Sequence, residues 1–231
     1  MNILAFFAHP EDAACLCAGT LMKYRARGDE IYIALASGTR PPVGAQQIGA
    51  HVRLSECAGD CVEDNMDARA DALTAIRWAN ADVILTHAPW DADGEHAVAG
   101  KLMNDSLLIV GGKLHPAHLP PIDKLPHLFY TDTLGGNRLT SRYCLDRLRS
   151  GDQSFYLTAG TFSNDPCQPE AYVQIDEFMQ TKLELLRAEP ELRALCQAHD
   201  RILGAQTGCS FAEGFSAHRN IGHLADLRLL P

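Results

Sequence analysis

Apolar residues recur along this chain in short continuous runs, and longer stretches with helical spacing lie between them. The clearest runs are typical of buried strands, because they are apolar on both faces. They cover residues 2–8, 31–36 and 81–86. Helical patterns occupy residues 11–27, 45–62, 68–79 and 96–110. This alternation predicts an α/β fold with a Rossmann-like, doubly wound and mostly parallel sheet.

The pattern is less regular in two places. No apolar run is visible after residues 45–62, where a third strand would belong. In the second half, we expect short strands at 128–131 and 155–158, one or two helices over 174–203 with a break near Pro190, and a short element at 209–215. Residues 111–126 read as a long irregular loop, which at this length often borders a functional site. We therefore expect a single domain over residues 1–231, with a C-terminal helical and short-strand appendage.

Composition narrows the class of protein. The chain has 231 residues and a net charge of −9 without a run of Lys or Arg, which argues against a general nucleic-acid binder. It enters a strand pattern without the basic segment of a signal peptide, and no apolar run reaches membrane-spanning length. Eight cysteines are present without a C-x-x-C pair, so reduced thiols are favoured over a disulfide framework. We expect a cytoplasmic protein without a membrane span.

Candidate chemistry first appears where the first strand ends. The run Ile3–Ala8 stops at His9, Pro10, Glu11 and Asp12. Proline suits the first turn of a helix, and the helix dipole favours acids there. Ligand sites in open α/β sheets lie at the carboxyl ends of strands, and histidine with carboxylate is a ligand set for zinc or a similar divalent ion. An acidic helix start with an incidental histidine is the alternative interpretation.

A second polar cluster follows the strand at 81–86. Residues 86–96 read T-H-A-P-W-D-A-D-G-E-H, with two histidines and three acids. Because neighbouring strand ends converge, His96 is placed to join His9 and Asp12 in the two-histidine, one-carboxylate set typical of catalytic zinc. Asp91 or Glu95 is then placed to orient a ligand histidine from behind. A solvated acidic loop is the alternative.

These stretches together resemble the zinc-dependent N-acetylglucosaminyl deacetylase family (PIG-L or LmbE-like). Residues 8–14 read A-H-P-E-D-A-A where the family has A-H-P-D-D-x-E, and A-G-T-L follows at 18–21. Residues 86–96 read T-H-A-P-W-D-A-D-G-E-H where the family has T-H-x-P-x-D-x-H-P-D-H. The strand end at 130–133 and the F-A-E-G-F tail at 211–215 are also similar, so the resemblance covers most of the chain.

The resemblance implies a function and a site. His9, Asp12 and His96 match the metal ligands, Glu11 stands at the position of the catalytic base, and Arg53 matches an arginine on the second helix that lies near substrate. Asp91, Asp93 and Glu95 are expected around these ligands. The implied reaction is metal-dependent hydrolysis, by water and a carboxylate base, of the acyl amide of an N-acetylated amino sugar or sugar conjugate. The resemblance also implies a possible homo-oligomer, for which the sequence carries no independent signal.

Two departures from the family's motifs concern proton transfer. Glu11 is one methylene longer than the family's aspartate, and Asp93 stands where many members have a histidine that assists the oxyanion or the leaving group. The histidines that could take over this assisting role are His87, His115 and His118. The alternative function is therefore a catalytically impaired relative that acts as a metal-containing sugar-binding or accessory protein. A nucleotide-binding protein is disfavoured, because neither G-x-G-x-x-G nor a P-loop follows the first strand.

Overall fold

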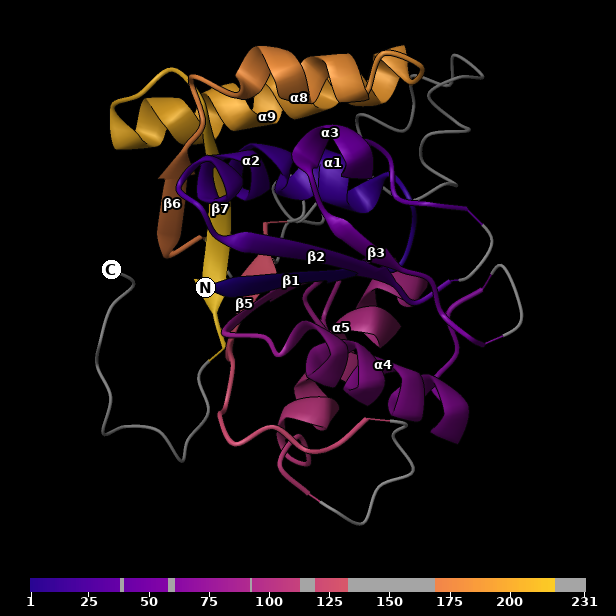
Figure 1. Cartoon of the computed structure of the whole chain (residues 1–231). Helices are drawn as coiled ribbons and strands as arrows, with labels where there is room; N and C mark the ends of the chain where they lie inside the picture. Colours follow the sequence, from indigo (N-terminus) through magenta and orange to yellow (C-terminus); the bar gives the residue numbers. More distant parts are fainter. Residues whose placement is uncertain (38–39, 58–60, 92, 113–118, 133–168, 219–231) are drawn as a thin grey trace.

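The computed structural model describes residues 1–37, 40–57, 61–91, 93–112, 119–132 and 169–218, which form one sheet covered by helices on both faces (Figure 1). The strands are β1 (Asn2–Phe7), β2 (Glu30–Leu35), β3 (His51–Arg53), β4 (Val83–Thr86), β5 (His127–Thr131), β6 (Ala171–Gln174) and β7 (Ala212–Ala217). The helices are α1 (Asp12–Leu16), α2 (Ala18–Ala26), α3 (Ala45–Ile48), α4 (Met66–Ala79), α5 (Gly94–Leu107), α8 (Met179–Leu185) and α9 (Pro190–Thr207).

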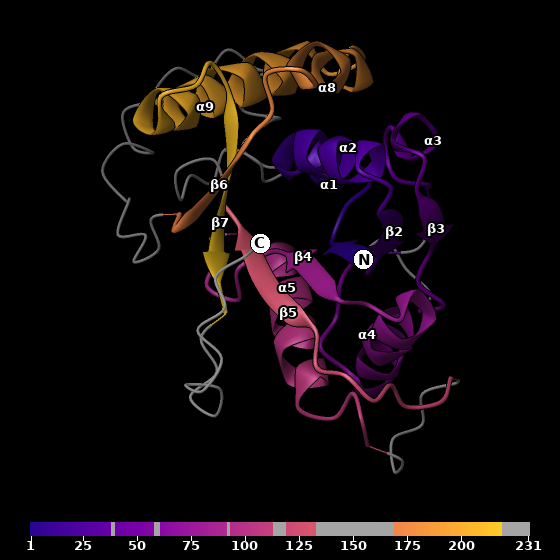
Figure 2. The ribbon, with the colours of Figure 1, turned by 60° about the vertical axis from the view of Figure 1, so that its left-hand side comes forward.

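The sheet is mostly parallel, as its apolar strands predict. Its seven strands have the order β3-β2-β1-β4-β5-β7-β6. All pairs from β3 to β5 are parallel, whereas β7 runs antiparallel to both β5 and β6. The predicted α/β class is therefore confirmed. The predicted C-terminal appendage consists of α8, α9 and two strands that extend the same sheet (Figure 2).

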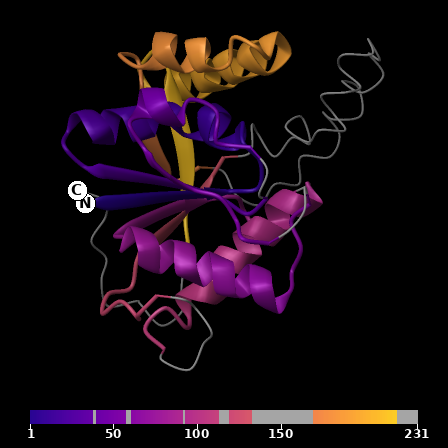
Figure 3. The ribbon, with the colours of Figure 1, turned by 45° about the vertical axis from the view of Figure 1, so that its right-hand side comes forward.

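Alternating side chains of β1 divide the core into two layers. Ile3, Ala5 and Phe7 pack with residues of α1, α2 and α9 on one face. Leu4 and Phe6 pack with α4 and α5 on the other. Because both faces of β1 are covered, the strand has to be apolar throughout. Figure 3 shows α4 and α5 side by side beneath the sheet, opposite α8 and α9.

The helix predicted over 11–27 is two helices, α1 and α2, that meet at Cys17. The break lets the second helix present its first N–H groups to an acid from the far end of the chain. The carboxylate of Glu213 in β7 accepts from the backbone N–H groups of Gly19 and Thr20 at 2.9 and 2.7 Å. Gly19 is needed at this contact, because a Cβ there would lie 2.7 Å from the side chain of Ile175.

The helix predicted over 45–62 is wrong. Gly44 and Gly49 adopt left-handed backbone angles (φ 76° and 74°) and confine the helix to the single turn α3. The strand missing from the sequence pattern follows at once as β3, which pairs with β2 through Tyr32 and His51. It escapes a search for apolar runs because it is a three-residue edge strand with exposed side chains. Arg53 therefore lies on a strand rather than on a helix.

Other predicted elements fall where the pattern places them. The break near Pro190 is confirmed, because α8 ends at Leu185 and α9 begins at Pro190. The predicted strand at 155–158 lies outside the described residues, as do His115 and His118. Across the part of the chain that the structure describes, no helix combines the length and apolar character needed to cross a bilayer.

Candidate metal centre

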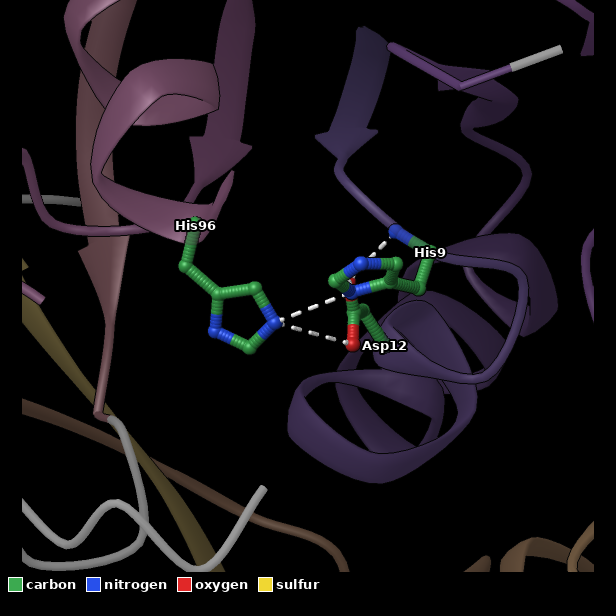
Figure 4. Close-up of side chains that lie close together, drawn as sticks. All are labelled: His9, Asp12 and His96. Atoms are coloured by element: carbon green, nitrogen blue, oxygen red, sulfur yellow. Dashed lines mark hydrogen bonds and ion pairs between the residues drawn. The ribbon is translucent and has the colours of Figure 1, made fainter. Parts of the chain in front are cut away.

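The three predicted metal ligands come together at the carboxyl edge of the sheet. His9 follows β1, Asp12 opens α1, and His96 lies in the first turn of α5, which follows β4. Strands β1 and β4 are direct neighbours, with Phe6 opposite Thr86. Figure 4 shows His96 approaching His9 and Asp12 from the opposite side of the site. The expectation that neighbouring strand ends would bring these residues together is confirmed by the geometry.

The spacing of the donor atoms fits a tetrahedral ion. Nδ1 of His9 lies 3.2 Å from Nε2 of His96. The carboxylate of Asp12 approaches the two histidines with different oxygens: Oδ1 lies 3.6 Å from Nε2 of His96, and Oδ2 lies 3.5 Å from Nδ1 of His9. A tetrahedral zinc with bonds of about 2.0–2.1 Å separates its donor atoms by about 3.3–3.4 Å. Two imidazoles and one carboxylate are also a donor set typical of catalytic zinc. The residues present therefore fit a zinc ion or a similar divalent cation.

Two acids orient the histidines of this group. Oδ2 of Asp91 lies 3.3 Å from Nδ1 of His96, and Oε2 of Glu95 lies 2.7 Å from Nε2 of His9. Because a carboxylate only accepts hydrogen bonds, each acid keeps the hydrogen on the outer nitrogen of its histidine. The lone pairs of the inner nitrogens, Nδ1 of His9 and Nε2 of His96, are then directed into the site.

Asp12 is held on its other oxygen by two further contacts. Its Oδ2 accepts from the backbone N–H of His9 at 2.7 Å and lies 3.0 Å from Nε2 of His87. His87 is fully buried and stacks on His96, with ring centroids 3.7 Å apart. The suggestion that His87 assists the reacting groups is therefore wrong, because it lies behind two of the ligands. The sequence could have predicted the contact between His87 and Asp12, because His87 directly follows β4 and Asp12 lies just beyond the end of the neighbouring strand β1.

The charges of the site favour a bound cation. Burial alone would lower the pKa of His9, but its hydrogen bond to Asp12 and the charge of that carboxylate outweigh burial and raise the pKa to about 9. Burial opposes the charge of Asp12 as well, yet His96 and His87 bring the pKa of that carboxyl well below its usual range. Without a metal ion, the group thus binds a proton strongly, which is the behaviour of a site that stabilises positive charge.

The remaining predicted residues have different surroundings. Glu11 precedes α1 as a half-buried residue, and its side chain makes no hydrogen bond or ion pair with described residues. Asp93 caps α5, where its carboxylate accepts from the N–H groups of Glu95 and His96 at 2.9 and 3.4 Å. Asp93 therefore contacts the ligand group only through the backbone N–H of His96 among the described residues.

Arg53 does not contact the metal ligands. It lies at the end of β3, two strands from β1, and donates to Asp71 at 2.5 Å and to Glu56 at 3.1 Å. Burial lowers the pKa of this guanidinium, but Asp71 more than compensates and the net shift is upward. A role of Arg53 in substrate binding stays a prediction.

Comparison with known proteins identifies the fold. No protein-family model and no curated protein matches the chain. Among solved structures, the 4-carboxy-2-hydroxymuconate hydratase GalB from Pseudomonas putida KT2440 superimposes with a TM-score of 0.71 at 13% identity, over 95% of this chain and 97% of that one. The N,N'-diacetylchitobiose deacetylase from Pyrococcus horikoshii superimposes with a TM-score of 0.69 at 14% identity, over 98% of this chain and 87% of that one.

A third match is the antimicrobial A40926 pseudoaglycone deacetylase Dbv21, with a TM-score of 0.60 at 15% identity, over 93% of this chain and 95% of that one. At identities this low, the matches show shared architecture alone, and each covers 93% or more of this chain. The chain therefore has the fold common to these deacetylases and to the hydratase, in agreement with the fold that its sequence motifs implied.

Proposed function

We propose that this protein is a metal-dependent hydrolase that removes an acyl group, such as acetyl, from an N-acetylated amino sugar or sugar conjugate. The observation that carries the proposal is the group of His9, Asp12 and His96, whose donor atoms have the spacing of a tetrahedral ion. Its position at the carboxyl edge of the sheet adds support, as does the resemblance of its two motifs to a deacetylase family. Two of the structures with this fold are named as deacetylases, one of N,N'-diacetylchitobiose and one of the A40926 pseudoaglycone.

The chain's own residues have separate tasks in this reaction. His9, Asp12 and His96 hold the zinc, which when bound polarises a carbonyl group and lowers the pKa of water. Asp91 and Glu95 fix the directions of the two imidazoles. These positions are set before substrate arrives, so little reorganisation is needed during the reaction.

Glu11 is the proposed base. It is separated by one residue from His9 and directly precedes Asp12, and its carboxylate is not engaged by any described residue. Glu11 takes a proton from the attacking water and passes it to the nitrogen of the leaving amine. A base must come within about 2.6–3.2 Å of the heavy atom that carries the proton, so this mechanism requires the glutamate carboxylate to reach the attacking water at that distance.

The fold alone does not separate a deacetylase from a hydratase, because both occur among the similar structures. The two sequence motifs favour the deacetylase, because residues 8–14 and 86–96 resemble the motifs of a deacetylase family around the three predicted ligands.

Amine release from N-acetylglucosamine and its oligosaccharides tests the proposal. We expect the zinc-loaded wild type to release amine and Glu11→Gln to be slower by roughly 10²–10⁴-fold, with unchanged zinc content. Zinc uptake without amine release over a broad panel of N-acyl sugars would favour the alternative, a metal-containing sugar-binding or accessory protein. Equal rates for the wild type and Glu11→Gln would remove Glu11 from the mechanism.

A further inference from the structure

We propose that His87 is a positioning residue of the metal centre, which holds Asp12 and His96 in place without touching metal or substrate. The inference rests on the proposed function and extends it to a residue behind the site. His87 is the first residue after β4 and has no exposed surface. It contacts two of the three ligands, one through a ring nitrogen and one through its ring face.

The contact with Asp12 fixes the position of the hydrogen on the imidazole. Nε2 of His87 lies 3.0 Å from Oδ2 of Asp12, and an ionised carboxylate can only accept. Nε2 therefore carries the hydrogen and donates it. The backbone N–H of Ala8 also points at this nitrogen, as a donor at 3.3 Å. A ring nitrogen that carries a hydrogen cannot accept, so the two contacts compete, and the assignment to Nε2 rests on the shorter contact with the charged carboxylate. With Oδ2 occupied by His87 and by the N–H of His9, Oδ1 is the oxygen left for a cation.

The opposite nitrogen supports this assignment. Nδ1 of His87 is buried and has no hydrogen-bond partner in the described structure. With the hydrogen on Nε2, Nδ1 carries only a lone pair, which agrees with its lack of a donor or acceptor nearby. The ring also lies parallel to His96, at an interplanar angle of 11°. Two stacked imidazoles cannot both direct in-plane lone pairs at one ion, which excludes His87 and His96 as joint ligands of a second metal.

The backbone around His87 leaves little room for movement. Its ring meets Phe7 edge-on at 4.9 Å. Helix α5 passes directly over the carbonyl of His87 at Gly100, where any Cβ would collide with that oxygen. Helix α5 thus confines the backbone at His87, and the rings of Phe7 and His96 confine its imidazole. A donor that is held this firmly restricts the rotation of the Asp12 carboxylate.

Two variants of nearly equal shape test the role of the N–H group. His87→Gln keeps a donor near the position of Nε2, whereas His87→Met has similar length and no donor. Zinc affinity is measured by competition with a chromophoric chelator, and the absorption spectrum of the cobalt-loaded protein reports ligand geometry. His51→Gln and His51→Met serve as controls, because His51 is exposed on β3.

We expect His87→Met to weaken zinc binding by about 10–100-fold and to change the cobalt spectrum, as for other residues that support metal ligands. His87→Gln should retain most of the affinity, and the His51 variants should match the wild type. Equal affinity of His87→Gln and His87→Met would overturn the inference while leaving the metal site intact. A wild type that binds no zinc would overturn the proposed function itself.

Discussion

Nζ of Lys182 lies 2.8 Å from Oε1 of Glu213, and neither side chain has any exposed surface. The same ammonium group donates to Asp200 at 2.6 Å. Glu213 in turn accepts from the start of α2, which directly follows the helix that carries Asp12. A buried ion network therefore connects the last strand and the helices α8 and α9 to the segment behind the metal centre.

Replacing Lys182 should destabilise the protein strongly. Lys182→Met leaves Glu213 as a buried acid without a cation and leaves Asp200 with only its longer contact to His199, at 3.8 Å. Loss of one partner of a buried pair costs about 3–5 kcal/mol. Urea denaturation of the metal-free protein measures the change in the free energy of unfolding. Lys101→Met is the matched control, because the ammonium group of Lys101 is paired at the surface with Asp105. Equal effects of the two variants would show that the buried network does not stabilise the fold.

His199 makes the free energy of unfolding depend on pH between about 6.5 and 9. Burial alone would lower its pKa, but hydrogen bonds to Asp132 and Asp200 raise the pKa from 6.5 to about 9. A raised histidine pKa contributes stability fully below pH 6.5, and the contribution is lost as the pH rises through about 9. At about 1.4 kcal/mol per unit of pKa, the effect is at most about 3.5 kcal/mol.

The comparison of wild type with His199→Gln isolates this effect. The difference in the free energy of unfolding should be large near pH 6 and should shrink toward pH 9.5. Other groups that titrate in this range, including His9, contribute to both proteins and cancel in the difference. A difference that is independent of pH would mean that His199 is not protonated in the folded protein at neutral pH.

Gly100 and Gly94 give a second matched pair within α5. A Cβ at Gly100 would collide with the backbone at His87 and Pro89, whereas nothing lies within 4 Å of a Cβ at Gly94. We expect Gly100→Ala to cost about 1–3 kcal/mol, because overpacking shifts the backbone. Gly94→Ala should leave stability unchanged or slightly raised. Thermal unfolding of both variants measures the effect, and a Gly100→Ala protein as stable as Gly94→Ala would contradict the close packing.

Asp93 should act as a helix cap. Its carboxylate accepts from two N–H groups at the start of α5, so Asp93→Ala should cost about 1 kcal/mol of stability. Asp93→Asn should cost less, because asparagine also caps helices. Denaturant midpoints of the two variants test this order. Asp93→Ala with wild-type stability would leave the position free for a role in the chemistry instead.

The sequence alone predicts the sheet and the ligand group well, for a physical reason. Fully buried parallel strands are apolar on both faces, so β1, β2 and β4 stand out as runs. Polar residues directly after such strands must lie at one edge of the sheet, and this places His9, Asp12 and His96 together. Asp91 and Glu95, which orient the histidines, are predicted for the same reason, because they lie in the 86–96 segment that also contains His96.

What the pattern does not reveal depends on contacts distant in sequence or on exposed elements. Strand β3 is short and exposed, so it has no apolar signature. The break at Cys17 is stabilised by Glu213, which lies nearly at the other end of the chain. Arg53 pairs with Asp71, which is 18 residues further along the chain, so local sequence patterns do not predict this ion pair. In each case the information lies in tertiary structure rather than in spacing.

The zinc content of the purified protein, wild type beside His96→Ala, tests the central claim most directly. Elemental analysis should find about one zinc per chain in the wild type, as expected of a three-ligand site, and little in the variant. His51→Ala should keep its zinc, since His51 lies apart from the group on β3. A wild type without bound metal after zinc loading, or a His96→Ala protein that retains it, would contradict the site and with it the proposed function.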